Sequence, residues 1–445
     1  MKTIDKIPTT KIGRTTELVK TGIKVGGNYL KYYGNKVVNP SLDKERLNQD
    51  NAEDIYNGLK SLKGSALKVA QMLSMEKNML PEAYVERFSL SQFSVPPLSA
   101  PLVRKTFKTY FGDYPENLYD TFATQSINAA SIGQVHQAFK DGKKLAVKIQ
   151  YPGVAQSISS DLAMVKPVAK KMFNIKGKES EKYFTEVEQK LLEETDYVLE
   201  LKQSQQIALD CSHIPNLKFP SYYPDLSNHR ILTMDWMDGA HLSEFAKANT
   251  NTEVANKLGQ TLWDYYMFQM HILKAVNADP HPGNFLVNTN NELIAIDFGC
   301  IKHIPDDFYG PYFELSRPEN LNNKKLFEKN MFKLEILRKE DTPAELAFFS
   351  EIFNEMIGLF TSPFAHDTFD FGDPVFWKQI ADLSDKFQND PEVRKMDAGR
   401  GSRHFLYMNR TFFGLYNLLH DLKAVVRVND FKKYIKHNAM PSKVA

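Results

Sequence analysis

The segment from Ala278 to Cys300 constrains the fold of this chain more than any other, and it reads ADPHPGNFLVNTNNELIAIDFGC. It predicts a proline-stiffened turn followed by two short apolar strands, FLV and LIAI, which a polar turn joins. Because a β-hairpin brings its two ends together, we expect Asp279, Asn284 and Asp297 to converge on one small volume. Their carboxylate and amide oxygens are hard ligands of the kind that hold Mg²⁺ against phosphates.

The same three residues favour phosphoryl transfer. That reaction needs metal-bridged phosphates and a carboxylate that orients the attacking oxygen. Asp279 and Asn284 have the separation of the Asp and Asn in a protein-kinase catalytic loop, and Asp297-Phe-Gly matches the kinase metal-binding tripeptide. A tripeptide alone can occur by chance beside an apolar strand. The rest of the chain therefore has to show whether these residues form a kinase-like site.

Composition excludes several other classes of protein. The chain has 445 residues, of which 42% are hydrophobic and 25% charged, as in a globular protein of two or three domains or of one two-lobed domain with extensions. A net charge of +2 gives no basic field, so we expect no nucleic-acid partner. Two cysteines provide no disulfide framework, and no long apolar run or signal peptide is evident. These features predict a cytoplasmic protein.

A second predicted hairpin places a lysine inside an apolar strand. The segment NAASIGQVH precedes one strand, and KLAVKIQ forms the other, with Lys148 at its centre. The small-residue loop ahead of the first strand contains Ala129, Ala130 and Ser131, and such a loop approaches phosphates closely through its backbone N–H groups. Lys148 lies where the ATP-binding lysine of kinases lies. The alternative is an edge-strand lysine that reaches water.

A lysine buried in a strand needs an anion as its partner. One long helix is predicted over residues 183–208, and it carries Glu194, Asp196 and Glu200. Asp196 and Glu200 lie one turn apart on one face, whereas Glu194 points roughly 160° away from Asp196. We expect Glu200 to pair with Lys148, with Glu194 as the second candidate.

The remaining segments are assigned more coarsely. A strand runs into an acidic turn near residue 235, where the backbone groups of Asp235 to Met237 are expected to meet an adenine edge. A helix over 54–75 places Lys68 and Gln71 together, away from its apolar face. Helices are also expected over 153–173, interrupted at Pro167, and over most of 313–445. The basic arm at 15–38 suits a membrane interface and a surface arm packed on the main domain equally well.

Eight motifs in order then identify a family: LKVAQ (67–71), SVPP (94–97), NAASIGQVH (128–136), LAVKIQYPGV (145–154), EETDY (193–197), LTMDWMDG (232–239), NADPHPGNF (277–285) and IDFG (296–299). Over roughly residues 55 to 305 the chain resembles the UbiB (AarF/ADCK) atypical protein-kinase-like proteins. The resemblance implies an α+β, two-lobed kinase-like fold with an alanine-rich loop in place of the glycine-rich one. It also implies an N-terminal helical extension whose Lys-x-Gly-Gln motif folds over the active site, and a helical C-terminal region.

By position, the resemblance makes Asp279 the catalytic-loop acid, Lys148 the ATP lysine and Glu200 its helix partner. The other carried-over positions are Ala129, Ala130 and Ser131 in the alanine-rich loop, Asn284 and Asp297 as metal ligands, Glu194 and Asp196 as the Glu-x-Asp motif, and Lys68 and Gln71 as regulatory residues. Two positions depart from the family pattern: Ala70 stands where the family has glycine, and Asn128 begins the alanine run.

The expected domains are a basic arm (1–54), the helical extension (55–125), an N-lobe with inserted helices (126–238) and a C-lobe with the helical C-terminal region (239–445). The resemblance implies ATP or ADP and Mg²⁺ as cofactors, and a role in isoprenoid quinone or lipid metabolism at a membrane surface, as an ATPase or unorthodox kinase. A nucleotide-binding pseudoenzyme and a small-molecule phosphotransferase remain as alternatives. The sequence leaves the physiological substrate open, and also the oligomeric state, for which a homodimer is one candidate.

Overall fold

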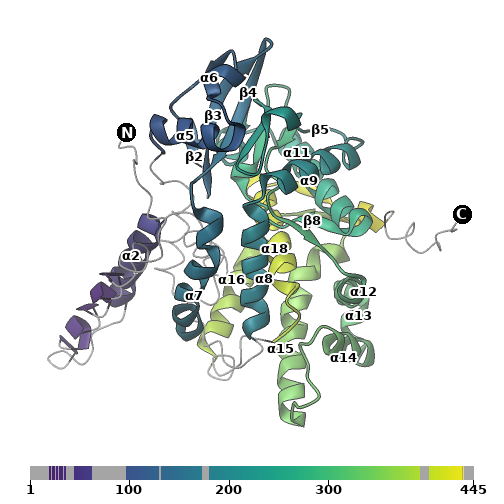
Figure 1. The fold of residues 1–445 in the computed structure, drawn as a ribbon. Coiled ribbons are helices and arrows are strands. Elements are labelled where there is room, and N and C mark those ends of the chain that lie inside the picture. The colour runs from purple at the N-terminus through teal and green to yellow at the C-terminus, as the bar shows by residue number, and fades with distance from the viewer. Residues whose placement is uncertain are drawn as a thin grey trace, which may run out of the picture. The chain divides into compact units, whose positions relative to one another are not determined.

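The structure, a computed structural model, describes residues 45–62, 97–129, 132–172, 180–390, 400–432 and 434, together with most residues between 20 and 36. The chain forms two compact units. Figure 1 shows the helices and strands of the described residues. The described residues up to 202 and from 221 to 236 belong to unit 1, and those from 203 to 220 and from 237 onward belong to unit 2. The finer division into arm, extension and lobes stays a prediction.

Unit 1 contains one antiparallel sheet in the order β1-β3-β4-β6, with β2 paired to β3. Its strands are β1 (Thr121–Phe122), β2 (Asn128–Ala129), β3 (Gly133–Lys140), β4 (Lys143–Gln150) and β6 (Ile231–Asp235). The predicted β3–β4 hairpin is confirmed, and Asp141 and Gly142 form its two-residue turn with φ of 51° and 74°. Two positive φ angles in succession define the type I′ turn that matches strand twist. Because β4 lies between β3 and β6, the edge-strand interpretation of Lys148 is wrong.

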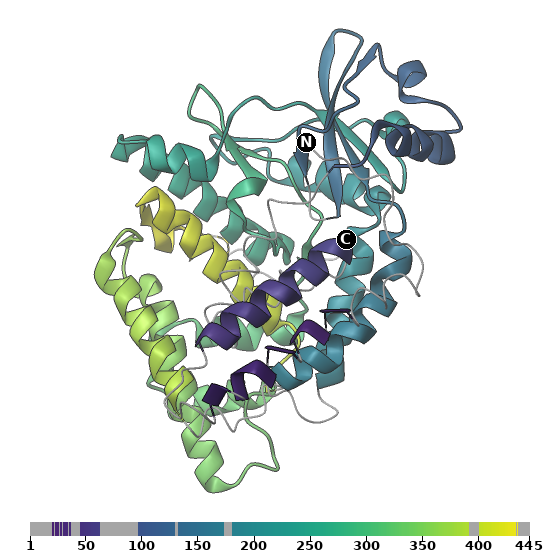
Figure 2. The ribbon, with the colours of Figure 1, turned by 90° about the vertical axis from the view of Figure 1, so that its left-hand side faces the viewer.

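The described helices that begin in unit 1 are α2 (Glu45–Leu62), α5 (Ala100–Phe111), α6 (Pro115–Leu118), α7 (Val154–Met172), α8 (Ser180–Glu194) and α9 (Tyr197–Asp210). Helices α7 and α8 lie side by side (Figures 1 and 2). Helix α7 runs through Pro167, so the predicted interruption is wrong. A proline removes one helical hydrogen bond, and packing along α8 holds the rest of the helix together. Residues 63–75, which belong to the helix predicted over 54–75, lie outside the described residues.

The single helix predicted over 183–208 is also wrong, because α8 and α9 are separate. The carbonyl of Thr195 accepts hydrogen bonds from Gln150 Nε2 at 3.0 Å and Arg230 Nη1 at 2.6 Å. Asp196 then caps α9 by accepting from the N–H groups of Val198 at 3.1 Å and Leu199 at 3.3 Å. Side chains therefore satisfy the backbone groups that the break leaves without helical partners.

Unit 2 contains a sheet in the order β5-β10-β9-β7 and two strand pairs, β8–β11 and β12–β13. The strands are β5 (Leu217–Lys218), β7 (Ala240–His241), β8 (Ala275–Asn277), β9 (Phe285–Val287), β10 (Leu293–Ala295), β11 (Ile301–His303), β12 (Thr368–Asp370) and β13 (Val425–Arg427). The β9–β10 hairpin confirms the one predicted from the opening segment, with Phe285 opposite Ala295. The β8–β11 pair encloses this hairpin and the residues that flank it.

Helices make up most of the rest of unit 2: α10 (Leu242–Ala248), α11 (Thr252–Phe268), α12 (Asp306–Leu315), α13 (Pro318–Leu321), α14 (Lys324–Lys333), α15 (Pro343–Thr361), α16 (Pro374–Asn389) and α18 (Phe405–Leu422). The core of α11 and α18 is strongly aromatic, with Trp263, Tyr265, Tyr266, Tyr407 and Tyr416 at most 1% exposed. The mostly helical prediction for 313–445 holds for the described part, except for β12 and β13. None of the described helices is long and apolar enough to cross a membrane.

A buried hydrogen-bond chain ties residue 98 to the sheet of unit 1. The N–H of Leu98 donates to Gln134 Oε1 at 2.7 Å, and Gln134 Nε2 donates to His136 Nε2 at 2.7 Å. His136 Nδ1 donates to the Ala123 carbonyl at 2.7 Å, which fixes the neutral tautomer. Burial lowers the pKa of His136 to about 4, against the weaker opposing effect of the bond to Ala123. The Gln and His of the GQVH motif are thus structural groups of the sheet.

This chain predicts a pH-dependent stability. His136 has a folded-state pKa of about 4 and an unfolded value near 6.5, so the unfolded state binds more protons and stability falls as pH drops from 6.5 toward 4. Between pH 7.5 and 5 the loss is about 2 kcal/mol. In denaturant titrations, His136→Gln should be less stable than wild type at pH 7.5 and should lose correspondingly less on acidification. The exposed control His303→Gln should behave as wild type, and equal acid losses in all three proteins would contradict the assignment.

Candidate functional site

Lys148 and Glu200 form a buried ion pair in unit 1. The distance from Lys148 Nζ to Glu200 Oε1 is 2.7 Å, and the two side chains are 9% and 4% exposed. Glu200 lies in the first turn of α9, and the ring of Tyr197 lies 5.2 Å from the ammonium. The predicted pairing with Glu200 is therefore confirmed, whereas the catalytic role of the pair stays a prediction.

The Glu-x-Asp motif lies at the junction of α8 and α9. Glu194 is the last residue of α8 and is buried. Asp196 is the cap of α9, and its Oδ1 also lies 3.3 Å from His229 Nδ1. The sequence did not predict that these two residues flank a break between helices. Their regulatory role remains a prediction.

In unit 2, Asn277 organises the predicted catalytic loop. Its Oδ1 accepts from the N–H of Asp279 at 3.1 Å, and its Nδ2 donates to the Asp297 carbonyl at 2.8 Å. Its own N–H donates to the buried side chain of Gln269 at 2.9 Å. One buried amide thus fixes the backbone of Asp279 relative to that of Asp297. Asn277 stands in the NADPHPGNF motif, but the sequence did not predict this role for it.

The geometry also fixes which way the Asn284 amide faces. Its Nδ2 donates to the Asp279 carbonyl at 2.8 Å and lies 3.3 Å from Asp279 Oδ2. The Asn284 carbonyl accepts from Ile296, which precedes Asp297, at 3.0 Å. The predicted convergence of Asp279, Asn284 and Asp297 is therefore confirmed at the level of these contacts.

This arrangement fits a magnesium ion. Because Nδ2 is the donor to Asp279, the Oδ1 atom of Asn284 is the group left to act as a ligand. Asp297 Oδ1 accepts from the Gly299 N–H at 2.9 Å, which holds the carboxylate in place. The described residues contain no group of three or more His, Cys, Asp or Glu side chains that could hold a metal. An Asn–Asp pair that shares its ion with substrate phosphates needs none.

Asp279 makes a further contact that the sequence did not predict. The Nη2 atom of Arg410, on α18, makes a close ion pair with Asp279 Oδ1. Arg410 lies 131 residues from Asp279 in the chain, and no motif flanks it. Only the folded contact identifies it.

The other predicted site residues are placed less fully. Asn128 and Ala129 form β2, while Ala130, Ser131, Lys68 and Gln71 lie outside the described residues. The N–H of Asp235 donates to the Ser221 carbonyl at 2.8 Å, and its side chain accepts from Tyr223 at 2.6 Å. The backbone N–H of Asp235 is therefore already paired, and the adenine contacts of Asp235 and Met237 stay predictions.

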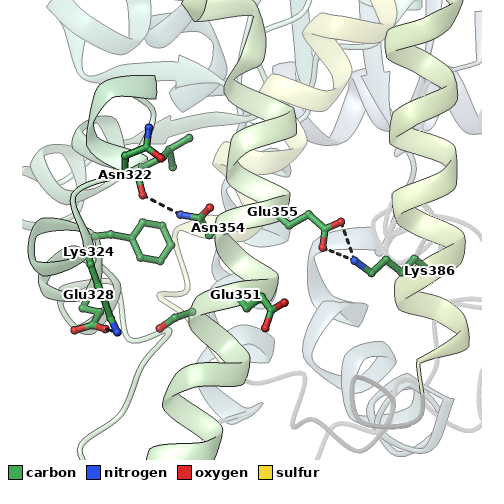
Figure 3. A pocket seen from close by; sticks show the side chains of 10 residues that line it. Asn322, Lys324, Glu328, Glu351, Asn354, Glu355 and Lys386 are labelled. Atoms are coloured by element: carbon green, nitrogen blue, oxygen red, sulfur yellow. Dashed lines mark hydrogen bonds and ion pairs between the residues drawn. The ribbon is translucent and has the colours of Figure 1, made fainter.

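A separate groove of about 640 Å³ lies beside α14, α15 and α16 in unit 2 (Figure 3). Lys386 Nζ lies 2.6 Å from Glu355 Oε2, and Lys324 lies 3.8 Å from Glu328. Because its lysines face carboxylates of their own, the groove does not suit a phosphate. None of the predicted site residues lines it.

The comparison with protein families decides the family. The model of the ABC1 atypical kinase-like domain matches residues 90–326, which is more than half of the chain. The chain belongs to this family. The ABC1 match confirms the resemblance to the UbiB (AarF/ADCK) proteins and the kinase-like α+β fold.

Three proteins illustrate how this ABC1 family member compares with known sequences and structures. It is 27% identical over 332 residues to the probable serine/threonine-protein kinase abkA of Dictyostelium discoideum, covering 69% of this chain and 59% of that one. It is 26% identical over 390 residues to the mitochondrial atypical kinase COQ8B of Danio rerio, covering 85% and 62%. The structure of Rv3197 from Mycobacterium tuberculosis, solved with erythromycin, has the same fold, with a TM-score of 0.60, 24% identity and coverage of 87% of this chain and 96% of that one. The chain thus spans about 60% of the length of abkA and of COQ8B.

A double-mutant cycle tests the Lys148–Glu200 pair. Lys148→Met or Glu200→Gln alone should lower the free energy of unfolding by about 3–5 kcal/mol, because each leaves a buried charge without its partner. The double variant should lose much less than the sum of the two single losses.

The matched control is the exposed pair Lys386 and Glu355, whose side chains are 57% and 42% exposed. Lys386→Met and Glu355→Gln should each cost less than about 1 kcal/mol, with weak coupling. Additive losses at Lys148 and Glu200 in denaturant titrations would contradict the pairing.

Proposed function

We propose that this ABC1 family protein binds Mg–ATP or Mg–ADP and turns over ATP as an atypical kinase-like phosphotransferase or ATPase. The observation that carries the proposal is the buried ion pair between Lys148 on the interior strand β4 and Glu200 on helix α9. An ammonium held by a carboxylate in this way is the group that orients ATP phosphates in kinase-like proteins. Stability alone does not explain why this ion pair is buried, because apolar side chains of similar volume often stabilise a core equally well. A role in binding phosphate would explain it.

The catalytic loop of unit 2 supports the same proposal. Asn284 and Asp297 would hold the magnesium ion, which when bound neutralises the phosphate charge during transfer. Asp279 would orient the attacking oxygen. Hydrogen bonds with Asn277 hold the backbones of Asp279 and Asp297 in place. Such preorganisation lowers the reorganisation that catalysis requires.

The family resemblance extends the proposal to isoprenoid quinone or lipid metabolism at a membrane surface. The N-terminal segment supports a surface role. Residues 20–36 contain four lysines and no acidic residue, and their described positions are helical. Asn28 donates to Asn51 and Asp54 on α2, whereas Ile23 and Leu30 are 70% and 77% exposed. One face of this helix thus packs and the other presents apolar groups beside lysines, as interfacial helices do.

The test of nucleotide binding uses magnesium and one metal ligand. ATP should raise the melting temperature of the wild type more strongly with Mg²⁺ than with chelator, because the hairpin oxygens reach phosphates only through the metal. Asp297→Asn should abolish the magnesium-dependent part of the shift and the release of phosphate. Asp385→Asn, an exposed change on α16, should match the wild type.

An equal rise in melting temperature with ATP and chelator would contradict the magnesium site. A magnesium-dependent shift without any phosphate release would instead favour the nucleotide-binding pseudoenzyme. Release that depends on an added small acceptor would favour the small-molecule phosphotransferase.

The membrane proposal is tested with vesicles. The protein should cosediment with vesicles that contain anionic lipid and much less with neutral ones. The double variant Ile23→Asp/Leu30→Asp should bind at least about tenfold more weakly, since it removes two large apolar groups from the contact. Val375→Asp alters a residue that is 60% exposed on α16 and serves as the control. Unchanged binding of the double variant would show that this face does not dock.

A further inference from the structure

Helix α18 lies beyond the segment that the ABC1 domain model matches, yet it contacts the predicted catalytic loop directly. Arg410 pairs with Asp279, and its side chain is only 6% exposed. One turn later, a Cβ atom added to Gly414 would lie 2.3 Å from Pro280 Cγ and 2.9 Å from the Pro280 carbonyl oxygen. A residue larger than glycine would push the helix and the loop apart. Two positions on one face of α18 therefore hold consecutive residues of the loop.

The contacts fix both oxygens of the Asp279 carboxylate. Arg410 Nη2 contacts Oδ1, and Asn284 Nδ2 lies 3.3 Å from Oδ2. The Asp279 backbone is held separately by Asn277 and Asn284. A carboxylate with a donor at each oxygen and a fixed backbone has one orientation, and a charge-assisted bond from a guanidinium is the strongest of these restraints.

We propose that Arg410 is a positioning residue for phosphoryl transfer and that it acts through Asp279. This inference rests on the proposed function, because it assigns the residue that aims the Asp279 carboxylate at the attacking oxygen. In the transfer, the attacking oxygen forms a bond to the terminal phosphorus and the bond to the bridging oxygen breaks. ADP leaves with the electron pair, and the proton of the attacking group passes to a phosphoryl oxygen. Arg410 contributes orientation, so it affects turnover and leaves nucleotide binding intact.

The experiment measures ATP turnover for Arg410→Gln and Arg410→Lys, each with Asp279 intact and combined with Asp279→Asn. With Asp279 intact, Arg410→Gln should lower kcat at least about tenfold with little change in KM for ATP, because misorientation of a reacting group affects the transition state. Arg410→Lys should retain part of kcat, since the charge remains and the planar fork is lost. In the Asp279→Asn background neither change should lower kcat further. Arg427→Gln, at an arginine whose side chain is 66% exposed, serves as the control.

A purely structural role for Arg410 predicts equal losses in both backgrounds, and that result would overturn the inference. So would wild-type kcat in Arg410→Gln. If Arg410→Gln fails to fold, the test uses Arg410→Lys instead, with kcat compared between the protein with intact Asp279 and the Asp279→Asn variant. Absence of both turnover and magnesium-dependent ATP binding in the wild type would overturn the proposed function itself. Wild-type turnover with no effect at Arg410 would overturn the inference alone.

Discussion

The buried ion pair between Lys148 and Glu200 is the interaction on which unit 1 depends. An ammonium at the centre of an interior strand is stable only with a desolvated carboxylate beside it, and the two atoms lie 2.7 Å apart. Glu200 reaches that position because α8 ends before it and α9 begins anew, with Asp196 as its cap. Gln150, two residues beyond Lys148 on β4, donates to the Thr195 carbonyl at the break. The strand that carries the lysine thus also holds the helix that carries its partner.

In unit 2, side-chain amides hold the loop that carries Asp279 and Asn284. A short loop between strands carries Asp279 and Asn284, and side chains from elsewhere supply the hydrogen bonds that regular structure does not. Asn277 links the loop to the Asp297 carbonyl, and Arg410 on α18 neutralises the Asp279 carboxylate. The hydrogen bonds of Asn284 Nδ2 to Asp279 make its Oδ1 atom the one that would act as a ligand of the proposed magnesium ion. Side chains on several elements therefore hold the loop in the conformation that the structure shows.

The sequence predicted the features that depend on short-range rules. Both hairpins follow from short apolar strands and the turn residues between them. Glu200 was predicted as the partner of Lys148 on one continuous helix, so the partner is right although the helix ends at Glu194 and a new one begins at Tyr197. The helix break at Thr195 was missed because its carbonyl is satisfied by Gln150 and Arg230, which are distant in the chain. Arg410 was missed for the same reason, since its role exists only through a contact across 131 residues. Asn277 stood within a quoted motif, but its two partners became visible only in the folded loop.

The proposed function requires that Lys148 is the lysine that contacts the ATP phosphates. The most direct measurement treats the protein with an acyl-phosphate derivative of ATP, which transfers its acyl group to the amine nearest the phosphates, and maps the labelled lysine by mass spectrometry. We expect the reagent to label Lys148, Mg–ATP to protect this lysine, and the protection to be lost in Asp297→Asn. Exposed lysines such as Lys324 and Lys378 should be labelled weakly and without protection. Labelling spread over exposed lysines, with Lys148 unmodified, would contradict the account.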